Sequence, residues 1–179
     1  MDAARALYAE ELGRRADAKE YLSSRGLTPE SVEAWSLGYA PNDWRALRDK
    51  LVDGGFSESE LERAGLIKRR EEEPGAPPAQ GSKFYDRFRG RIMFPLKDVS
   101  GRTIAFSGRI FEDDPVHPQA KYLNSPETPI FDKSRALYGI ERARDHIRSL
   151  NAAILVEGQL DLLLAHQLGY KNAVATSGT

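Results

Sequence analysis

Two carboxylates near the end of the chain have a spacing that could hold a metal ion. Glu157 follows a short apolar run, and Asp161 comes four residues later, where leucines recur at helical spacing. Open α/β sheets bind ligands at the carboxyl ends of their strands, so both side chains would lie at one such edge. Carboxylate oxygens, waters and substrate phosphates are the usual ligands of Mg²⁺. On spacing alone, a solvated strand end followed by an acidic first helical turn is the preferred interpretation.

Basic and aromatic residues are interleaved over residues 83–109. Seven basic residues stand against two acidic ones there, an excess of five positive charges in a chain whose net charge is −1. Cations that follow phosphates and rings that stack on bases are typical of surfaces for single-stranded nucleic acid. The rings could equally form a core whose outer face the arginines solvate, and composition does not separate the two. The basic residues are Lys83, Arg87, Arg89, Arg91, Lys97, Arg102 and Arg109.

A third candidate is the irregular stretch over residues 121–127. It lacks clear periodicity and carries Lys121, Tyr122 and Asn124. Such a stretch is suited to present hydrogen-bond donors to a phosphate or a base.

The composition excludes several kinds of site. None of the 179 residues is Cys, which rules out disulfides and thiolate zinc sites, and His117, His146 and His166 are too scattered for a recognisable metal cluster. Any metal must therefore be held mainly by oxygen. No run is long and apolar enough to cross a membrane, and the N-terminus has charges where a signal peptide needs an apolar segment. We expect a cytoplasmic protein without a membrane partner.

Helix signals fill the first third of the chain. Good helix formers are separated by capping residues and glycines, which predicts four helices. We interpret their aromatic and leucine side chains, Trp44 among them, as core residues. The predicted helices cover residues 2–22, 28–38, 42–51 and 57–65.

The residue pattern in the middle of the chain predicts strands. Residues 68–82 are charged and then rich in Pro and Gly, which indicates a surface loop. Apolar residues then alternate over 91–97 and 103–110, which predicts a β-hairpin with one apolar face and one polar face. A polar helix is expected over 134–150, broken or started near Gly139.

The last part of the chain reads as strand, helix, strand. Residues 153–156 form a wholly apolar run that predicts a strand buried on both faces. A helix should follow over 159–168, and residues 173–176 should form a second strand. The two strands would then lie parallel, joined by a right-handed crossover.

Several longer strings resemble motifs of the bacterial replicative DNA primase family and occur in that family's order. The resemblance covers residues 21–179, and the K-Y-L-N-S-P-E-T string is far more specific than the carboxylate pair. The strings are K-F-Y-D-R-F-R-G-R-I-M-F-P-L-K-D, F-S-G-R, K-Y-L-N-S-P-E-T-P-I-F-D-K, L-Y-G, V-E-G-Q-L-D and A-T-S-G-T.

The resemblance implies an α+β fold in two parts. Residues 1–150 correspond to the helical and β-hairpin N-terminal subdomain of the primase core, and residues 151–179 to the first β-α-β unit of an α/β Toprim sheet. The family synthesises short RNA primers on single-stranded DNA. We therefore expect a single-stranded DNA template, ribonucleoside triphosphates, and Mg²⁺ or Mn²⁺ as cofactor, with no zinc in this chain.

The resemblance also implies roles for individual residues. Glu157 looks like the Toprim glutamate that acts in metal binding or proton transfer, and Asp161 like its acidic companion. Arg25 is similar to a template-side arginine. Positions expected to hold template or nucleotide phosphates are Arg109, Lys121, Tyr122, Asn124 and Lys133, with Arg87, Arg89 and Arg91 as accessory basic residues.

The sequence departs from the family pattern in three respects. Gln159 stands where the family usually has an aromatic residue. Neither the zinc-binding N-terminal domain nor the C-terminal domain that binds the replicative helicase is present in these residues. The family's Asp-x-Asp metal motifs would lie beyond Thr179. We therefore expect a truncated Toprim domain and no turnover by this chain alone.

Two other functions stay open. The chain could be a module that binds single-stranded DNA without catalysis. Another Toprim enzyme, a topoisomerase or nuclease, ranks lower, because a topoisomerase needs a nucleophilic Tyr in a separate domain and the K-Y-L-N string resembles primases.

Overall fold

Short helices fill the first third of the chain in the computed structural model, which describes residues 1–70, 83–112 and 119–176. Thr28 caps one of them by accepting a hydrogen bond from the backbone N–H of Ser31. Ser57 and Glu60 form the predicted capping box of another. These helices are α1 (Asp2–Arg14), α2 (Ala16–Ser24), α3 (Pro29–Ala34), α4 (Ala46–Asp53) and α5 (Glu58–Arg63).

The prediction of a single helix over residues 2–22 is wrong, because the helix is interrupted at Arg15. The backbone of Arg15 is extended, with φ −107° and ψ 97°. Its guanidinium donates to the Tyr39 hydroxyl at 2.9 Å and to the Glu112 carboxylate at 2.8 Å. These partners lie far along the sequence, so local helix propensity carries no sign of them.

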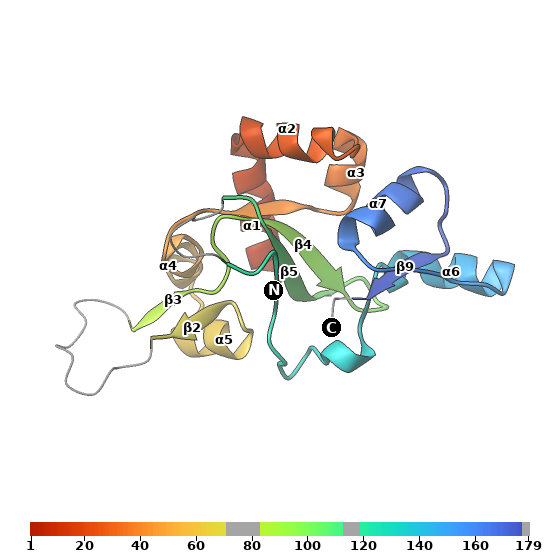
Figure 1. Cartoon of the computed structure of the whole chain (residues 1–179). Coiled ribbons are helices and arrows are strands. Elements are labelled where there is room, and N and C mark those ends of the chain that lie inside the picture. Colours follow the sequence, from red (N-terminus) through yellow and green to blue (C-terminus); the bar gives the residue numbers. More distant parts are fainter. Residues whose placement is uncertain (71–82, 113–118, 177–179) are drawn as a thin grey trace.

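The centre of the molecule is a four-stranded antiparallel sheet (Figure 1). The predicted hairpin is confirmed as its two longest strands, which pair with Ile92 opposite Arg109 and Phe94 opposite Ser107. In order across the sheet, the strands are β1 (Gly38–Ala40), β4 (Arg91–Lys97), β5 (Thr103–Ile110) and β6 (Tyr122–Asn124).

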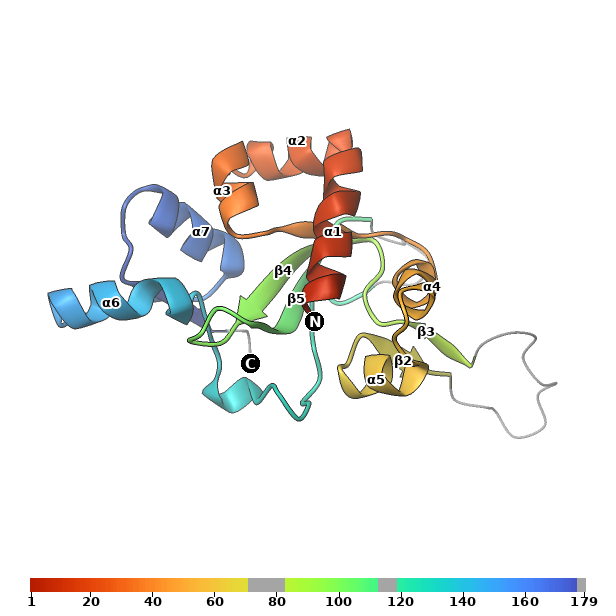
Figure 2. The ribbon, with the colours of Figure 1, turned by 180° about the vertical axis from the view of Figure 1, so that it is seen from behind.

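The prediction of one apolar and one polar face for this hairpin is wrong. Ile92 and Phe94 of β4 belong to a core cluster that also includes Leu22 of α2 and Leu37. On the other face, Met93 and Phe106 pack with Tyr8, Leu47 and Leu61 from the helices α1, α4 and α5. Figure 2 shows α1 crossing this second face. Helices therefore cover both faces of the sheet, and most residues of β4 and β5 are buried.

Strand β1 was not predicted, because the sequence suggested a helix as far as Gly38. Gly38 is where α1 touches the sheet: a Cβ atom there would lie 2.5 Å from the Cβ and 2.8 Å from the backbone carbon of Tyr8. Only a residue without a side chain allows this approach. A strand of three residues offers too little periodicity to be found from sequence.

A two-stranded ribbon was also missed. It consists of β2 (Ile67–Arg69) and β3 (Phe84–Asp86), which pair antiparallel. Most of the loop predicted over 68–82 lies outside the described residues. Asp86 ends β3 and caps α4 by accepting from the backbone N–H groups of Leu47 at 2.7 Å and Arg48 at 2.9 Å. Helix α4 consequently starts at Ala46 instead of near residue 42.

The last part of the chain forms a three-stranded sheet in the order β7-β9-β8. The predicted strand, helix, strand unit is confirmed, with β8 and β9 parallel. The polar helix starts just after Gly139, as one alternative had it. The elements, after the 3₁₀ turn η1 (Lys133–Arg135), are β7 (Leu137–Tyr138), α6 (Ile140–Leu150), β8 (Ile154–Val156), α7 (Gln159–Gln167) and β9 (Ala173–Thr176).

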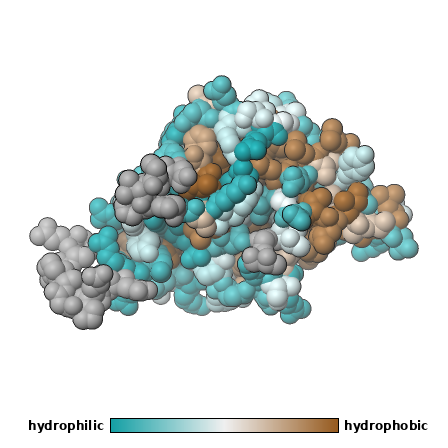
Figure 3. All heavy atoms as spheres, in the orientation of Figure 1, coloured by the Kyte–Doolittle hydropathy of each residue, from teal (hydrophilic) through white to brown (hydrophobic). Residues whose placement is uncertain are grey.

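Strand β8 is not buried on both faces, contrary to the prediction. Leu155 is 63% exposed and Ile154 is 37% exposed, since β8 lies at one edge of the sheet and, within the described residues, pairs with β9 alone. Hydrophobic atoms gather on this side of the molecule, over α6 and α7 (Figure 3). The inner strand β9 is the buried one, with Ala173 and Ala175 at 0% exposure.

The central sheet and the three-stranded sheet share one hydrophobic core. Together with the helices they make the α+β fold that the sequence predicted. Leu160, Leu162 and Leu163 of α7 pack in the same cluster as Trp35 and Phe94. The expected boundary near residue 150 therefore falls within a continuous hydrophobic core. Within the described residues, no helix is long and apolar enough to span a membrane.

Candidate nucleic-acid interface

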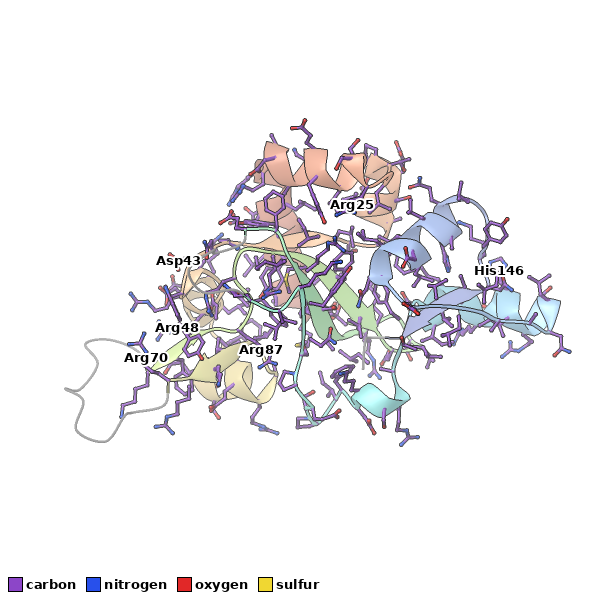
Figure 4. The ribbon with its side chains drawn as sticks, viewed as in Figure 1. Arg25, Asp43, Arg48, Arg70, Arg87 and His146 are labelled. Carbon is purple, nitrogen blue, oxygen red and sulfur yellow. The ribbon has the colours of Figure 1, made fainter. Side chains whose placement is uncertain are left out.

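Two arginines and two tyrosines, distant in sequence, meet beside the central sheet. The Arg109 guanidinium donates from Nε to the Tyr21 hydroxyl at 2.6 Å and from Nη1 to the Tyr122 hydroxyl at 2.7 Å. Arg25 lies over the Tyr21 ring, 5.3 Å from its centroid. We call these four residues the arginine–tyrosine cluster. Figure 4 shows Arg25 at the corner between α2 and α3.

The cluster holds positive charge against neutral partners. Burial lowers the pKa of Arg109, but the hydrogen bonds that Arg109 donates to the Tyr122 and Tyr21 hydroxyls, together with electrostatic interactions with these groups, outweigh burial, so the net shift is upward. Arg109 is 8% exposed, whereas Arg25 is exposed. A guanidinium whose partners are phenol groups keeps its charge for an incoming anion, since charge-assisted hydrogen bonds to phosphate are strong.

The other predicted phosphate contacts flank this cluster or lie apart from it. Lys121 is exposed and adjoins Tyr122, while its carbonyl accepts from the backbone of Ile110 at 2.9 Å. Asn124 ends β6, opposite Ser107. Lys133 begins the separate turn η1, where its backbone N–H donates to Glu127 at 3.0 Å.

Two of the three accessory arginines are used inside the protein. Arg91 is 2% exposed, and its guanidinium donates to the carbonyls of Gly108 at 3.1 Å and Ala120 at 3.0 Å. Arg87 donates to the carbonyl of Asn124 at 2.9 Å, and burial lowers its pKa. The accessory basic role of Arg91 stays a prediction, and in the structure its buried side chain holds the chain that enters β6.

Arg89 belongs to a second basic and aromatic site, on the ribbon side of the molecule. Its guanidinium lies 4.1 Å from the Trp44 ring centroid and 5.2 Å from that of Tyr85, and the two rings meet edge to face at 5.4 Å. A hollow of about 300 Å³ beside them is lined by Trp44, Tyr85 and the exposed Lys68, Arg69 and Arg70. We call these residues, with Arg89, the tryptophan patch.

Sequence reasoning missed Trp44, which it placed in a helical core. Trp44 is 56% exposed and precedes α4. A ring this exposed, with an arginine over one face, is suited to stack on a base and does not pack in a core. The charged neighbours Asp43 and Arg45 gave no signal of this, because adjacent residues of a helix point to different faces.

The predicted acidic pair lies where the sequence placed it. Glu157 follows β8, Asp161 lies in the first turn of α7, and both are exposed. A Cβ atom at Gly158 would lie 2.7 Å from Oδ2 of Asp161, so this carboxylate folds back over the strand end. Gly158 leaves room for that fold.

The pair suits a hard divalent cation. Within residues 1–70, 83–112 and 119–176, no three acidic, His or Cys side chains gather as a ready metal cage. One or two carboxylates are nevertheless what Mg²⁺ commonly takes from a protein when substrate phosphates and waters complete its shell. The donor set therefore fits a metal that arrives with a phosphate ligand.

Known proteins with similar sequences decide the family. The family described as DNA primase catalytic core, N-terminal domain, matches residues 7–144. A DNA primase of Pseudomonas putida is 42% identical over 100% of this chain, which spans 26% of that relative. This chain belongs to the DNA primase family. A DNA primase of Deinococcus radiodurans is 41% identical over 90% of the chain and is likewise covered over 26% of its length.

Solved primase structures share the fold. The RNA polymerase domain of Mycobacterium tuberculosis primase, in complex with double-stranded DNA, matches with a TM-score of 0.87 at 34% identity, over 99% of this chain and 53% of that one. A primase catalytic domain bound to single-stranded DNA matches with a TM-score of 0.81 at 36% identity, over 100% of this chain and 52% of that one. The chain thus spans about half of these primase domains.

Proposed function

We propose that this chain is the template- and nucleotide-binding part of a primase core that makes RNA primers on single-stranded DNA. The observation that carries the proposal is the arginine–tyrosine cluster, in which Arg25 and Arg109 converge on Tyr21 without a carboxylate partner in the described contacts. Ribonucleoside triphosphates and template both bring phosphates to it. Such an activity belongs in the cytoplasm of a bacterium.

The reaction is nucleotidyl transfer. A ribose 3′-hydroxyl attacks the α-phosphorus of a triphosphate, the bond to the bridging oxygen breaks, and pyrophosphate leaves. Arg109 would hold a phosphate oxygen through its charge, and Lys121 would do so at the exposed rim. A divalent metal, Mg²⁺ or Mn²⁺, when held by Glu157 and Asp161, supplies charge that offsets the phosphate oxygens.

The tryptophan patch would hold the template away from the reacting groups. Trp44 and Tyr85 offer ring faces for bases, and the cations of Arg89 and β2 follow the backbone. Stacking on such rings tolerates any sequence, which suits an enzyme that copies its template. Duplex or single-stranded DNA bound to related domains supports contact with DNA.

Salt-dependent fluorescence anisotropy with a labelled single-stranded oligonucleotide tests the DNA-binding part. Trp44→Ala should weaken binding by about 1 to 3 kcal/mol, or roughly 5-fold to 150-fold, because a stacked base is lost. Arg109→Ala should weaken binding and lower the slope against salt by about one phosphate contact.

Matched controls exist elsewhere on the surface. Phe56→Ala removes another exposed ring (41% exposed), and Arg14→Ala removes a different arginine, which is exposed on α1. Both should bind DNA as the wild type does. Equal losses in the controls and in the test variants would show nonspecific attraction and overturn the assignment of this interface.

Nucleotide binding separates a polymerase core from a module that only binds DNA. Equilibrium dialysis with labelled ATP should show affinity that Mn²⁺ increases and that Lys121→Ala and Glu157→Gln each reduce. Salt-dependent DNA binding with no metal-dependent ATP binding would instead favour the noncatalytic module.

A further inference from the structure

A buried hydrogen bond links the acidic edge to the strand that carries Arg109. Gln159, the first residue of α7, donates from Nε2 to Oγ of Ser107 on β5 at 3.1 Å. Gln159 is 4% exposed and Ser107 is 0% exposed. A buried amide and hydroxyl each need a partner, so this pair fixes the orientation as well as the position of the helix start.

The bond lies between the two halves of the proposed site. Glu157 is two residues before Gln159, and Arg109 is two residues after Ser107. Alternate residues of a strand point to the same face, so Ser107 and Arg109 share the face that α7 covers. Leu160 and Leu163 of α7 also pack in the core cluster on this face, and apolar packing is non-directional, so it sets no single rotation of a helix.

A second glutamine fixes the other end of α7 to the segment that carries Arg25. Oε1 of Gln167 accepts from the backbone N–H of Thr28 at 3.0 Å and from the Ser31 hydroxyl at 2.8 Å. Its Nε2 donates to the carbonyl of Gly26, next to Arg25, at 2.9 Å. Helix α7 is therefore held by polar contacts at both ends.

We propose that Gln159 is a positioning residue, which through Ser107 sets the distance between the Glu157–Asp161 edge and Arg109. Gln167 does the same for Arg25. The inference rests on the proposed function, because a metal at the carboxylates and a triphosphate at the arginines must meet at one fixed separation. Reacting groups misplaced by an ångström lose much of their effect.

Distance measurement by electron spin resonance tests the geometry directly. The chain contains no Cys, so nitroxide labels can be attached at Lys121→Cys and Asp161→Cys alone. The otherwise unchanged chain should give one narrow distance. Gln159→Met, which keeps the side-chain length but loses the donor, should broaden or shift that distance, and Ser107→Ala should do the same.

A metal-dependence measurement tests the consequence in the unlabelled chain. The ratio of ATP affinities with and without Mn²⁺ should fall in Gln159→Met from about ten toward one. Thr103→Val is the matched control, because Thr103 is also a buried residue of β5 with a hydrogen-bonded hydroxyl, which donates to Asp2 of α1 at 2.6 Å instead of meeting α7. It should leave the ratio and the distance unchanged.

The double variant Gln159→Met with Ser107→Ala separates positioning from stability. It leaves neither polar group unpaired, so its midpoint of thermal unfolding should recover while the distance stays broad and the Mn²⁺ ratio stays low. Recovery of all three, or a Gln159→Met variant that changes only the unfolding midpoint, would overturn the inference. A wild type whose labels give a narrow distance but whose ATP affinity ignores Mn²⁺ would overturn the proposed function instead.

Discussion

The central sheet and the three-stranded sheet bury their strands to different extents, and not in proportion to how apolar the strands are. Strand β5 is covered on both faces, so that even Ser107 and Arg109 are buried within it. Strand β8 is a run of Ile, Leu and Val, yet Leu155 is 63% exposed. The difference lies in position, because helices flank both faces of β5 while β8 is an edge strand. Strand composition reports the tendency to be buried, and neighbours decide whether burial occurs.

The largest expected effect is on the contact between α1 and the central sheet. Gly38→Val should abolish folding, at a cost above about 3 kcal/mol, because its side chain would collide with the backbone of Tyr8. Gly169→Ala, between α7 and β9, should cost only about 1 kcal/mol. A Cβ atom there would meet open space, and only the positive φ of Gly169 opposes the change. Urea unfolding of both proteins provides the comparison, and equal costs would contradict it.

The next effect is a pH dependence at Asp86, where the two-stranded ribbon meets α4 beside the central sheet. Burial raises the pKa of Asp86 to about 7, whereas an unfolded aspartate titrates near 3.8. The folded protein therefore binds an extra proton between these values, and the free energy of unfolding should fall as pH rises through them, by up to about 4 kcal/mol. Asp86→Asn keeps an acceptor for α4 and should flatten this slope. An unchanged slope in urea unfolding at pH 5 and pH 8 would refute the assignment.

At the three-stranded sheet and its helix α7, the free energy of unfolding should change with pH in the opposite direction and less strongly. Burial lowers the pKa of His166 below 6.5, and the neutral ring donates from Nε2 to the Ala173 carbonyl at 2.9 Å. Just below pH 6.5 the unfolded state binds the extra proton, so the free energy of unfolding should rise with pH there. His166→Gln should remove this rise. If the rise persists in that variant, it comes from another group.

The smallest effect is expected at the edge strand. Leu155→Ser should change the free energy of unfolding by less than about 0.5 kcal/mol, because the side chain is mostly exposed already. Val174→Ser on the neighbouring inner strand should cost about 2 kcal/mol or more, since Val174 is 3% exposed. Comparable losses in the two variants would show that β8 is buried in solution.

Local signals in the sequence predicted the features that local physics determines. Capping residues at Thr28 and Ser57 gave two helix starts, and alternation gave the hairpin of β4 and β5. The break at Arg15 and the short strand β1 escaped, because partners far along the chain create them. Burial of β8 was predicted wrongly for the same reason.

The candidate site divides in the same way. The family resemblance marked Arg25, Arg109 and Tyr122, and the structure brings these three together around Tyr21. The resemblance did not reveal that Arg91 is buried and donates hydrogen bonds to backbone carbonyl groups within the protein. Trp44 was hidden by the expectation that large rings are core residues. Residue type suggested which side chains could bind phosphates or bases, and only the structure shows which of them are exposed.

The position of Tyr21 between two arginines affects how salt changes the stability of the protein. One ring is shared by two guanidinium groups, with Arg25 at 5.3 Å and Arg109 at 5.9 Å from its centroid. Two like charges held this close repel each other, and dissolved salt screens that repulsion. Moderate salt should therefore stabilise this corner of the fold while it weakens DNA binding. A bound phosphate would serve as the missing counter-ion, so the ligand would complete the electrostatics of the fold itself.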